Sequence, residues 1–587
     1  MKLMWLAAFL ILYALVCLGI AIYCARRRRD TSSTLVSTIG FSTIAFAGWL
    51  VVSYPAGIYA NGLGYGALAF APLAMAFAAA AFYERINWLS ARYQVTTPGD
   101  LFAQYFRTEF MRVPVALIAL SVALAFLVAV FKASGDLLYL LTEESLPPFY
   151  GASLSAVIVT GALLLGGRCA LVRLSFLQTA LLILATYLLG FKTIELIGGV
   201  EAFAEVFKVL QVGDTANGTA GANKYLSMPD NCLADLGGVF AYTGIIVGPA
   251  FLLWAIRASS ASQLRGHYIV GLAGLLSVVL LTGMSAIGFA GHLLGANLNL
   301  TEIAPDAIYN VLAAALGAGD ITEHELGTRA LVPLIVNVFG QTGDMVATAL
   351  SGFMGVAFLA AMHASAGAIL YLSAVVISSD GVMTSANKIG TRIIMVLLGL
   401  SAVAALFVGG VWHEYAAMIA LAAGCLMWPA LLAICFVHWF TAPAIIMGMI
   451  SGALAIGGSL YFEPKIVHQA VAGLAVNFSA VIIVSLFTQA GVEHRAQFHR
   501  ELRAHTSLIG KSAIVLCVII VWSIFAFGPA AFLGENAFGK AGAPESWLHG
   551  LAPPLWVWQL CWWLIGMIVL YWAANRFGMR AERAENG

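Results

Sequence analysis

The sequence contains few charged residues. Only 10% of its 587 residues are Asp, Glu, Lys or Arg, whereas soluble domains carry about 25%. Hydrophobic residues make up 61%. This balance excludes an ordinary soluble domain and indicates an all-α polytopic membrane protein. The net charge of +1 and the lack of a basic patch interleaved with aromatic residues exclude nucleic acid as a partner.

The sequence also lacks the motifs of most enzymes. It contains no GxSxG, HExxH or Walker sequence, and these patterns mark nucleophilic, zinc and phosphate chemistry. Its eight cysteines are scattered, and none shows the CxxC or Cys/His spacing of a metal site. Seven of them fall in or beside apolar segments, where Cys usually acts as a small hydrophobe. We therefore expect no enzyme and no prosthetic cofactor.

Long apolar runs dominate what is present. A membrane-spanning helix needs about 20 predominantly apolar residues. The first run, residues 3–25, is too long for a signal-peptide core, so we expect it to stay as a helix of the mature protein. Fifteen spans are predicted: 3–25, 35–60, 63–83, 112–142, 151–166, 174–197, 236–257, 267–292, 343–378, 391–411, 416–437, 441–462, 467–488, 509–530 and 553–576.

The basic residues predict the orientation of these spans. Loops on the cytoplasmic side carry an excess of Lys and Arg. With the N-terminus outside, 21 of the 29 Lys and Arg residues fall on the inner side. The pattern predicts an N-terminus outside and a C-terminus inside, in the inner membrane of a bacterium.

The segment 33–63 is apolar enough to cross the bilayer but is broken from within. Gly40 and Gly48 lie in its body, and Pro55-Ala56-Gly57 interrupts its far end. Unwound backbone at membrane depth survives only where it lines a cavity, so this segment is a candidate binding site. Five spans later a second break falls at Gly248-Pro249. Matching breaks of this kind indicate two inverted repeats of five helices.

Several motifs occur in an order that resembles the sodium/solute symporter family, which has the LeuT-type fold. The resemblance covers about residues 1–500. The residues from about 505 to 580 resemble the small two-helix subunit found beside some family members. The motifs are Thr97-Pro98-Gly99-Asp100-Leu101, Gly166-Gly167-Arg168 with Leu177-Gln178, Gly248-Pro249, Leu359 to Ser365 with Asp380, and Val484 to Thr488.

This resemblance implies a core of two inverted five-helix repeats with one extra N-terminal helix and four C-terminal helices. The expected parts are an extra helix and basic loop at 1–32, the first repeat at 33–200, the second repeat at 201–438, accessory helices at 439–489, a charged cytoplasmic linker at 490–511 and the small-subunit-like tail at 512–587.

The resemblance also implies a sodium site between the second and ninth spans. Carbonyl oxygens of Thr43, Phe46 and Ala361 would contribute, and Ala364 and Ser365 occupy the two hydroxyl positions. Only Ser365 keeps its hydroxyl. Ala45 and Ser175 stand where the family often has acidic residues, so the site is poor in oxygen. Three alternatives stay open: Na⁺ coupling through carbonyls and substrate, H⁺ coupling, or loss of coupling.

The expected substrate pocket adjoins this site. Its candidate residues are Trp49 after the first break, Tyr242, Gly248 and Pro249 at the second break, and the intramembrane pair Lys132 and Asp136. A lone charge at membrane depth is costly and needs a partner. Lys132 is therefore either half of an internal ion pair, a group that binds a substrate carboxylate, or a cation that replaces Na⁺.

The function expected from the resemblance is secondary active symport of a small organic solute with Na⁺ or H⁺ by alternating access. A monocarboxylate is favoured, because the tail resembles the small subunit of monocarboxylate transporters and Lys132 can neutralise an anion. An amino-acid symporter is the second alternative. A sensor that binds solute and signals to a partner through residues 490–511, without coupled flux, is the third.

Overall fold

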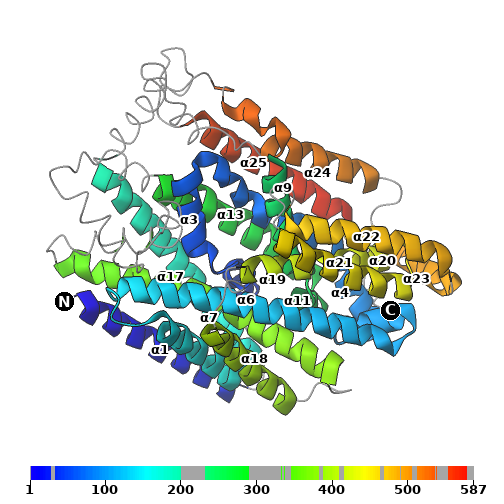
Figure 1. The fold of residues 1–587 in the computed structure, drawn as a ribbon, viewed down its shortest axis with the longest axis horizontal. Helices are drawn as coiled ribbons and strands as arrows, with labels where there is room; N and C mark the ends of the chain where they lie inside the picture. Colours follow the sequence, from blue (N-terminus) through cyan, green and yellow to red (C-terminus); the bar gives the residue numbers. More distant parts are fainter. Residues whose placement is uncertain are drawn as a thin grey trace, which may run out of the picture.

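The structure, a computed structural model, describes residues 2–27, 33–197, 199, 232–289, 332, 336, 345–382, 388–408, 415–462, 468–489, 491–505, 512–535, 537–538 and 553–577. Every regular element in these ranges is a helix (Figure 1). The all-α class predicted from the sequence is confirmed. The domain boundary predicted between residues 200 and 201 lies outside the described residues.

The first half of the chain contains both helix breaks and several long helices. Its elements are α1 (Lys2–Arg26), α2 (Thr34–Ile44), α3 (Leu50–Asn61), η1 (Leu63–Phe70), α4 (Ala71–Tyr93), α5 (Pro98–Phe106), η2 (Glu109–Met111), α6 (Arg112–Leu141), α7 (Pro148–Ile197), α9 (Cys232–Ala241), α10 (Thr243–Val247), α11 (Pro249–Ile256), α12 (Ala261–Arg265), η4 (Gly266–Leu276), α13 (Ser277–Val279) and η5 (Leu280–Met284).

The second half continues the helical body and ends in a helix pair. Its elements are α17 (Met345–Val376), η6 (Ile377–Val382), α18 (Lys388–Val408), α19 (Ala416–Cys425), α20 (Trp428–Cys435), α21 (Ala442–Phe462), α22 (Gln469–Phe487), α23 (Val492–His505), α24 (Ser512–Ala526), η8 (Pro529–Glu535) and α25 (Pro554–Phe577).

Eleven described helices are long and apolar enough to cross a membrane, or twelve if the bent pair at 236–256 forms one span. Four differences separate eleven from the predicted fifteen. The spans 151–166 and 174–197 lie in one element, the span 236–257 is bent, and the spans 35–60 and 509–530 contain only shorter helices. These shorter helices, α2, α3 and α24, have 11, 12 and 15 residues. A multi-pass membrane protein is supported, while the count of fifteen spans and their orientation stay predictions.

The element α7 consists of two helices that meet at Gly167, in keeping with the two spans expected at 151–166 and 174–197. The helices run from Pro148 to Ile197 with non-helical angles inside only at Gly167. Gly167 has φ 55° and ψ −142°, a conformation that glycine reaches without the steric cost of a Cβ. The two helices are therefore joined at a single residue and not by the expected seven-residue loop.

The long helices form one bundle in which α7 is central. Helix α7 packs against α1, α2, α6 and α17, and α19 lies between α6 and α10. Helices α24 and α25 pair with each other on one edge of the body (Figure 1). Three α25 side chains donate hydrogen bonds to body carbonyls: Trp556 to Leu281 at 2.6 Å, Trp563 to Ala273 at 2.8 Å and Gln559 to Leu63 at 3.1 Å.

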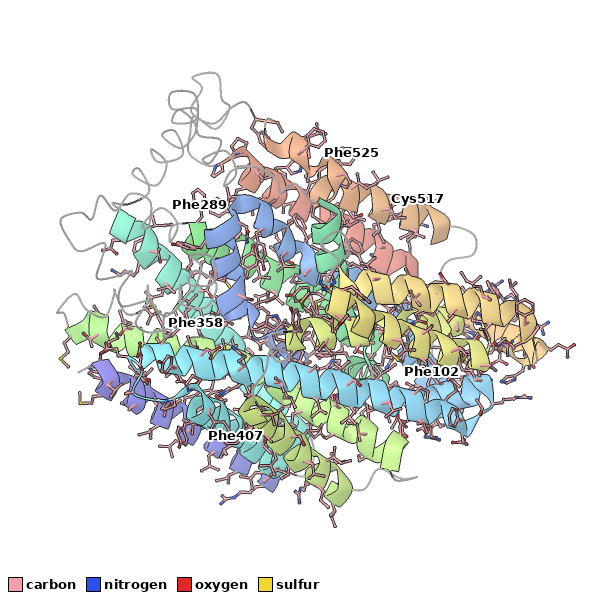
Figure 2. All side chains as sticks on the ribbon, viewed as in Figure 1. Phe102, Phe289, Phe358, Phe407, Cys517 and Phe525 are labelled. Carbon is pink, nitrogen blue, oxygen red and sulfur yellow. A yellow bond between two sulfur atoms is a disulfide. The ribbon has the colours of Figure 1, made fainter. Side chains whose placement is uncertain are left out.

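The outer surface is as apolar as the interior. Phe102 and Phe358 are buried inside the bundle, whereas Phe407 on α18 is 78% exposed (Figure 2). Large exposed apolar side chains are frequent along α1, α18, α21 and α22. Such a surface is costly in water, so these helices face lipid hydrocarbon.

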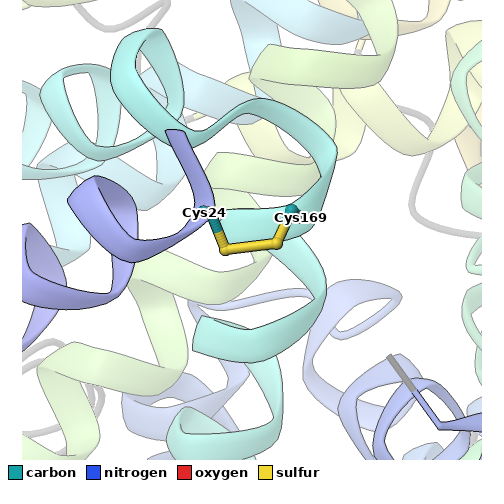
Figure 3. The surroundings of a disulfide bond; sticks show 2 residues. All are labelled: Cys24 and Cys169. Carbon is teal, nitrogen blue, oxygen red and sulfur yellow. A yellow bond between two sulfur atoms is a disulfide. The ribbon is translucent and has the colours of Figure 1, made fainter. Parts of the chain in front are cut away.

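A disulfide joins Cys24 in the last turn of α1 to Cys169, two residues after the kink of α7 (Figure 3). The Cα atoms are 5.6 Å apart. The expectation that these cysteines act only as small hydrophobes is therefore wrong for this pair. The predicted orientation places both cysteines on the cytoplasmic side, where thiols are normally kept reduced. The disulfide instead indicates an oxidising compartment, so the two observations point to opposite sides of the membrane.

Candidate functional site

The first helix break lies between α2 and α3. Residues 45–49 are non-helical, and all five are buried. Within the described residues, no backbone hydrogen bond is made to the carbonyls of Ile44, Ala45 or Phe46. Three unpaired carbonyls at this depth are costly unless something else binds them. The break therefore presents oxygen atoms suited to a hard cation.

Helix α17 faces this break through Ser365. A Cβ added at Gly48 would lie 2.5 Å from Ser365 Oγ and 3.0 Å from Met362 Cα, so glycine is what allows the two segments to approach. The Ser365 hydroxyl donates to the Met362 carbonyl at 3.0 Å. It is fully buried, as are Ala361 and Ala364 nearby. The structure thus brings the first break and Ser365 together.

Thr43 contributes to the break through its backbone only. Its carbonyl accepts the Phe46 N–H at 3.3 Å. Its hydroxyl lies 2.7 Å from Thr179 Oγ1 and donates to the Ser175 carbonyl at 3.1 Å, both on α7. This side-chain interaction fixes the end of α2 against α7. It was not foreseen from the sequence, because Thr179 belongs to no motif that we recognised.

The second break, at Gly248-Pro249, bends the span by 51°. Gly248 has φ −65° and ψ 155°, and Pro249 opens α11, where its missing N–H and fixed φ are tolerated. The Gly248 carbonyl accepts N–H groups from Phe251 and Leu252, each at 3.1 Å. The break predicted here is present. In the described residues no backbone hydrogen bond is made to the carbonyls of residues 245–247, although that of Ile246 accepts the Tyr83 hydroxyl at 3.1 Å.

Aromatic residues from both breaks meet each other. Tyr242 lies directly before α10, and its side chain lies next to that of Trp49. The Trp49 ring also packs on Phe126 of α6, with centroids 4.8 Å apart. Trp49 and Tyr242 are each 8% exposed. These rings form an apolar wall beside the unpaired carbonyls.

Lys132 and Asp136 form an ion pair along α6. The Lys132 Nζ and Asp136 Oδ2 atoms are 3.0 Å apart, and the two residues are one helical turn apart. Their side chains are 22% and 29% exposed. Each is the other's ion-pair partner within the described residues. The structure records no contact between this pair and the break residues, so the two candidate groups are separate there.

A buried carboxylate joins α5 to the end of α17. Asp380 accepts the Thr97 hydroxyl at 2.5 Å and the Gly99 N–H at 2.9 Å. Arg112 lies 3.4 Å from Asp380 and also pairs with Asp100. Burial raises the pKa of Asp100, but hydrogen bonds from Thr96 and Arg112 outweigh it and lower that pKa overall. These motifs could be recognised in the sequence, but the hydrogen bonds and ion pairs between them could not.

Within the described residues, no three His, Cys, Asp or Glu side chains are placed to hold a metal ion. A Na⁺ site built from carbonyls and one hydroxyl needs none of them. The groups that can bind a cation here are therefore the free carbonyls of the first break and Ser365.

No protein-family model and no curated protein matches the sequence. Among solved structures, the chain is similar to a Na⁺-coupled sialic acid symporter in a substrate-bound outward-open state, at a TM-score of 0.64 and 16% identity. The alignment covers 82% of this chain and 98% of that one. The chain has the LeuT-type fold. MhsT in complex with L-phenylalanine also matches, at 14% identity, a TM-score of 0.43 and 78% and 99% coverage.

The LeuT-type fold agrees with the expectation of two inverted repeats built around two broken spans. In the described residues, one span is interrupted by the non-helical residues 45–49, and another is bent by 51° at Gly248. At 16% identity the likeness concerns the fold alone, so the ion and the solute have to be argued from the residues present.

Proposed function

We propose that the protein is a secondary active transporter that moves a small organic solute together with Na⁺ or H⁺ by alternating access. The observation that carries this proposal is the first break, where three carbonyls lack a backbone partner in the described residues and Gly48 packs closely on Ser365. A fold shared with a Na⁺-coupled symporter supports it. Solute and ion bound at neighbouring positions would each favour the same closed state, and that mutual preference is the coupling.

We favour Na⁺ over H⁺ as the coupling ion. Within the break and its facing helix turn, the oxygens are carbonyls and one hydroxyl, and such neutral oxygens bind Na⁺ without exchanging a proton. The proposed ligands are the carbonyls of Thr43, Phe46 and Ala361 and the side chain of Ser365, with Ala364 adding none. A substrate oxygen would complete this sparse shell, which makes ion binding depend on solute.

We propose a monocarboxylate as the solute, bound between the Trp49–Tyr242 wall and the second break at Gly248 and Pro249. A carboxylate would supply the missing oxygen to the cation. Lys132 is the intramembrane cation that could attract it, although Asp136 already neutralises Lys132 at 3.0 Å. The carboxylate must therefore compete with Asp136, and an amino acid is the alternative solute.

The test is uptake of radiolabelled small carboxylates and amino acids into proteoliposomes with an imposed Na⁺ or pH gradient. We expect Na⁺ to drive accumulation, and Ser365→Ala to raise the Na⁺ concentration for half-maximal uptake about tenfold. Ser351→Ala is the matched control, because Ser351 is also buried on α17 and donates to the carbonyl three residues before it, at 2.8 Å.

Other outcomes separate the alternatives. Uptake that ignores Na⁺, follows the pH gradient and disappears in Lys132→Gln would replace Na⁺ by H⁺. Solute binding without accumulation under either gradient would replace the transporter by a sensor. Equal Na⁺ dependence in Ser365→Ala and Ser351→Ala would remove the proposed ion site.

A further inference from the structure

A polar cavity of about 750 Å³ lies beside α23, far along the chain from both breaks. Its walls come from the residue that caps α5, from the connection between α20 and α21, and from one face of α23. The lining residues are Arg107, His438, Glu493, His494, Ala496, Gln497, His499, Arg500 and Arg503. From the sequence we expected this segment to be a charged cytoplasmic linker.

The cavity wall is held by specific packing. Phe498 of α23 stacks on Tyr93 with ring centroids 4.9 Å apart. His499 Nε2 lies 3.0 Å from the Tyr105 hydroxyl and 2.9 Å from the Ala433 carbonyl. Arg495 Nε donates to the His438 carbonyl at 2.9 Å. Helix α23 is therefore docked on the body, and the cavity shape follows from that docking.

The cavity is strongly basic. Arg107, Arg500 and Arg503 face one carboxylate, that of Glu493, so the charged side chains sum to +2. Burial lowers the pKa of His499 to about 4, and burial with the nearby charge of Arg107 lowers that of His494. These two histidines are neutral at pH 7, so they add nothing to the charge set by the three arginines and Glu493.

These residues match one class of ligand. Within the described residues no group of three His, Cys, Asp or Glu can hold a metal ion, although three histidines and a glutamate line the cavity. Guanidinium groups bind phosphate oxygens in pairs of parallel hydrogen bonds. The volume of this cavity falls in the range of small-molecule sites. It is larger than a single inorganic ion would fill.

We propose that this cavity binds a phosphate-bearing anion, whose phosphate oxygens are held by Arg107, Arg500 and Arg503. The anion is either a soluble phosphorylated compound of about nucleotide size or the headgroup of an anionic lipid at the membrane surface. Both sources present the same chemistry to the three arginines. The proposal is independent of the transport function, because it concerns binding at a separate cavity.

A consequence for transport rests on the proposed function. Helix α5 carries Arg107 at its C-terminal end and Thr97 at its N-terminal end, and Thr97 hydrogen-bonds Asp380 at the end of α17. An anion that bridges Arg107 to Arg500 would hold α5 against α23. Movement of α5 relative to α17 would then cost more, so occupancy would slow the transport cycle.

The test uses the full chain in nanodiscs of zwitterionic lipid, titrated with ATP and with pyrophosphate by calorimetry. We expect saturable binding of at least one probe, weakened about tenfold or more in R500Q/R503Q. Both arginines are exposed, so the double variant should fold. Lys388→Gln, an exposed cation at the start of α18, is the control and should bind as the parent does.

Nanodiscs that contain phosphatidylglycerol distinguish the two sources. If the lipid headgroup is the ligand, we expect ATP binding to weaken with increasing phosphatidylglycerol in the parent, and the lipid retained on purification to fall in R500Q/R503Q. The proposal is overturned if neither probe nor lipid binds, or if binding is unchanged in R500Q/R503Q. A protein that binds anion but transports nothing would refute only the proposed function.

Discussion

The two helix breaks differ in length and in what they pack against. The first break spans five residues, 45–49, and leaves the carbonyls of Ile44, Ala45 and Phe46 without a backbone partner in the described residues. The second is confined to Gly248, and the three carbonyls before it, those of residues 245–247, likewise lack a backbone partner there, although that of Ile246 accepts the Tyr83 hydroxyl at 3.1 Å. Both breaks therefore expose carbonyl oxygens, and the surroundings of each decide what it can do.

Close packing explains why the second break stays narrow. A Cβ at Gly244 would overlap the Leu421 carbonyl and lie 3.0 Å from Cys425 N, and a Cβ at Gly424 would overlap the Gly244 carbonyl. Helices α10 and α19 therefore touch backbone to backbone through two glycines. The first break meets α17 at Gly48 alone, against the Ser365 side chain and the Met362 backbone. The first break thus packs through one glycine and the second through a pair of facing glycines.

The largest expected effect comes from filling the first break. Gly48→Val places its Cβ 2.5 Å from Ser365 Oγ and 3.0 Å from Met362 Cα, and the backbone of α17 cannot rotate away. We expect gradient-driven uptake to fall about 100-fold or more, because the pocket closes or the two segments separate. Uptake into proteoliposomes measures this.

The matched control is Gly458→Val on α21, where an added Cβ meets nothing within 4 Å. It should transport as the parent does. Normal uptake in Gly48→Val would mean that the close approach of the first break to α17 has no part in function.

Filling the second break should damage stability first. Gly244→Ala forces α10 and α19 apart at a backbone contact, and overpacking of this kind costs about 1–3 kcal/mol. We expect thermal unfolding in detergent at a lower temperature, with Na⁺ dependence of the remaining uptake unchanged. Gly238→Ala in the same span, which meets nothing within 4 Å, should not shift the unfolding temperature. Altered Na⁺ dependence in Gly244→Ala would give this break a direct part in ion binding.

A carboxylate introduced at each break sharpens the comparison. Ala45 and Ala250 are both buried, at 0% and 3% exposure, one beside the free carbonyls and one in α11. We expect Ala45→Asp to bind Na⁺ about tenfold more tightly than the parent, which is about 1.4 kcal/mol, since the cation then neutralises the buried charge. Ala250→Asp should bind Na⁺ no more tightly than the parent. The unfolding temperature, measured as a function of Na⁺ concentration, reports the Na⁺ affinity of both variants. Tighter Na⁺ binding only in Ala250→Asp would place the ion site at the second break.

The sequence allowed the fold and both breaks to be predicted, because glycine, proline and long apolar runs report directly on backbone in a membrane. Gly48 and Gly248-Pro249 both interrupt their helices as expected, whereas the interruption expected at Pro55-Ala56-Gly57 is wrong, because α3 runs through these residues. How each break is paired could not be predicted. That depends on which carbonyl a neighbouring N–H reaches, and on contacts such as Gly244 with Gly424, which join residues 180 positions apart.

Other features were missed for a related reason. Nothing local marks Cys24 and Cys169 as partners, since 145 residues separate them. The charged segment at 490–511 was interpreted as a linker because its charges dominate the pattern. Yet Phe498 and Leu502 are buried one turn apart, and their spacing was the signal that α23 docks on the body. The roles proposed for Trp49, Tyr242, Lys132 and Asp136 stay predictions.

The smallest expected effect tests whether proline creates the second bend or only accompanies it. Pro249 lies at the first position of α11, where its N–H would have no helical partner in any case. Gly248 already has ψ 155°, and a Cβ there would lie 2.9 Å from the Gly244 carbonyl oxygen. We therefore expect Pro249→Ala to lower the free energy of unfolding by less than about 1 kcal/mol, with the bend and the uptake kept. Loss of uptake in a stably folded Pro249→Ala variant would show that the proline ring itself holds the bend, and the two breaks would then differ in what maintains them as well as in what they bind.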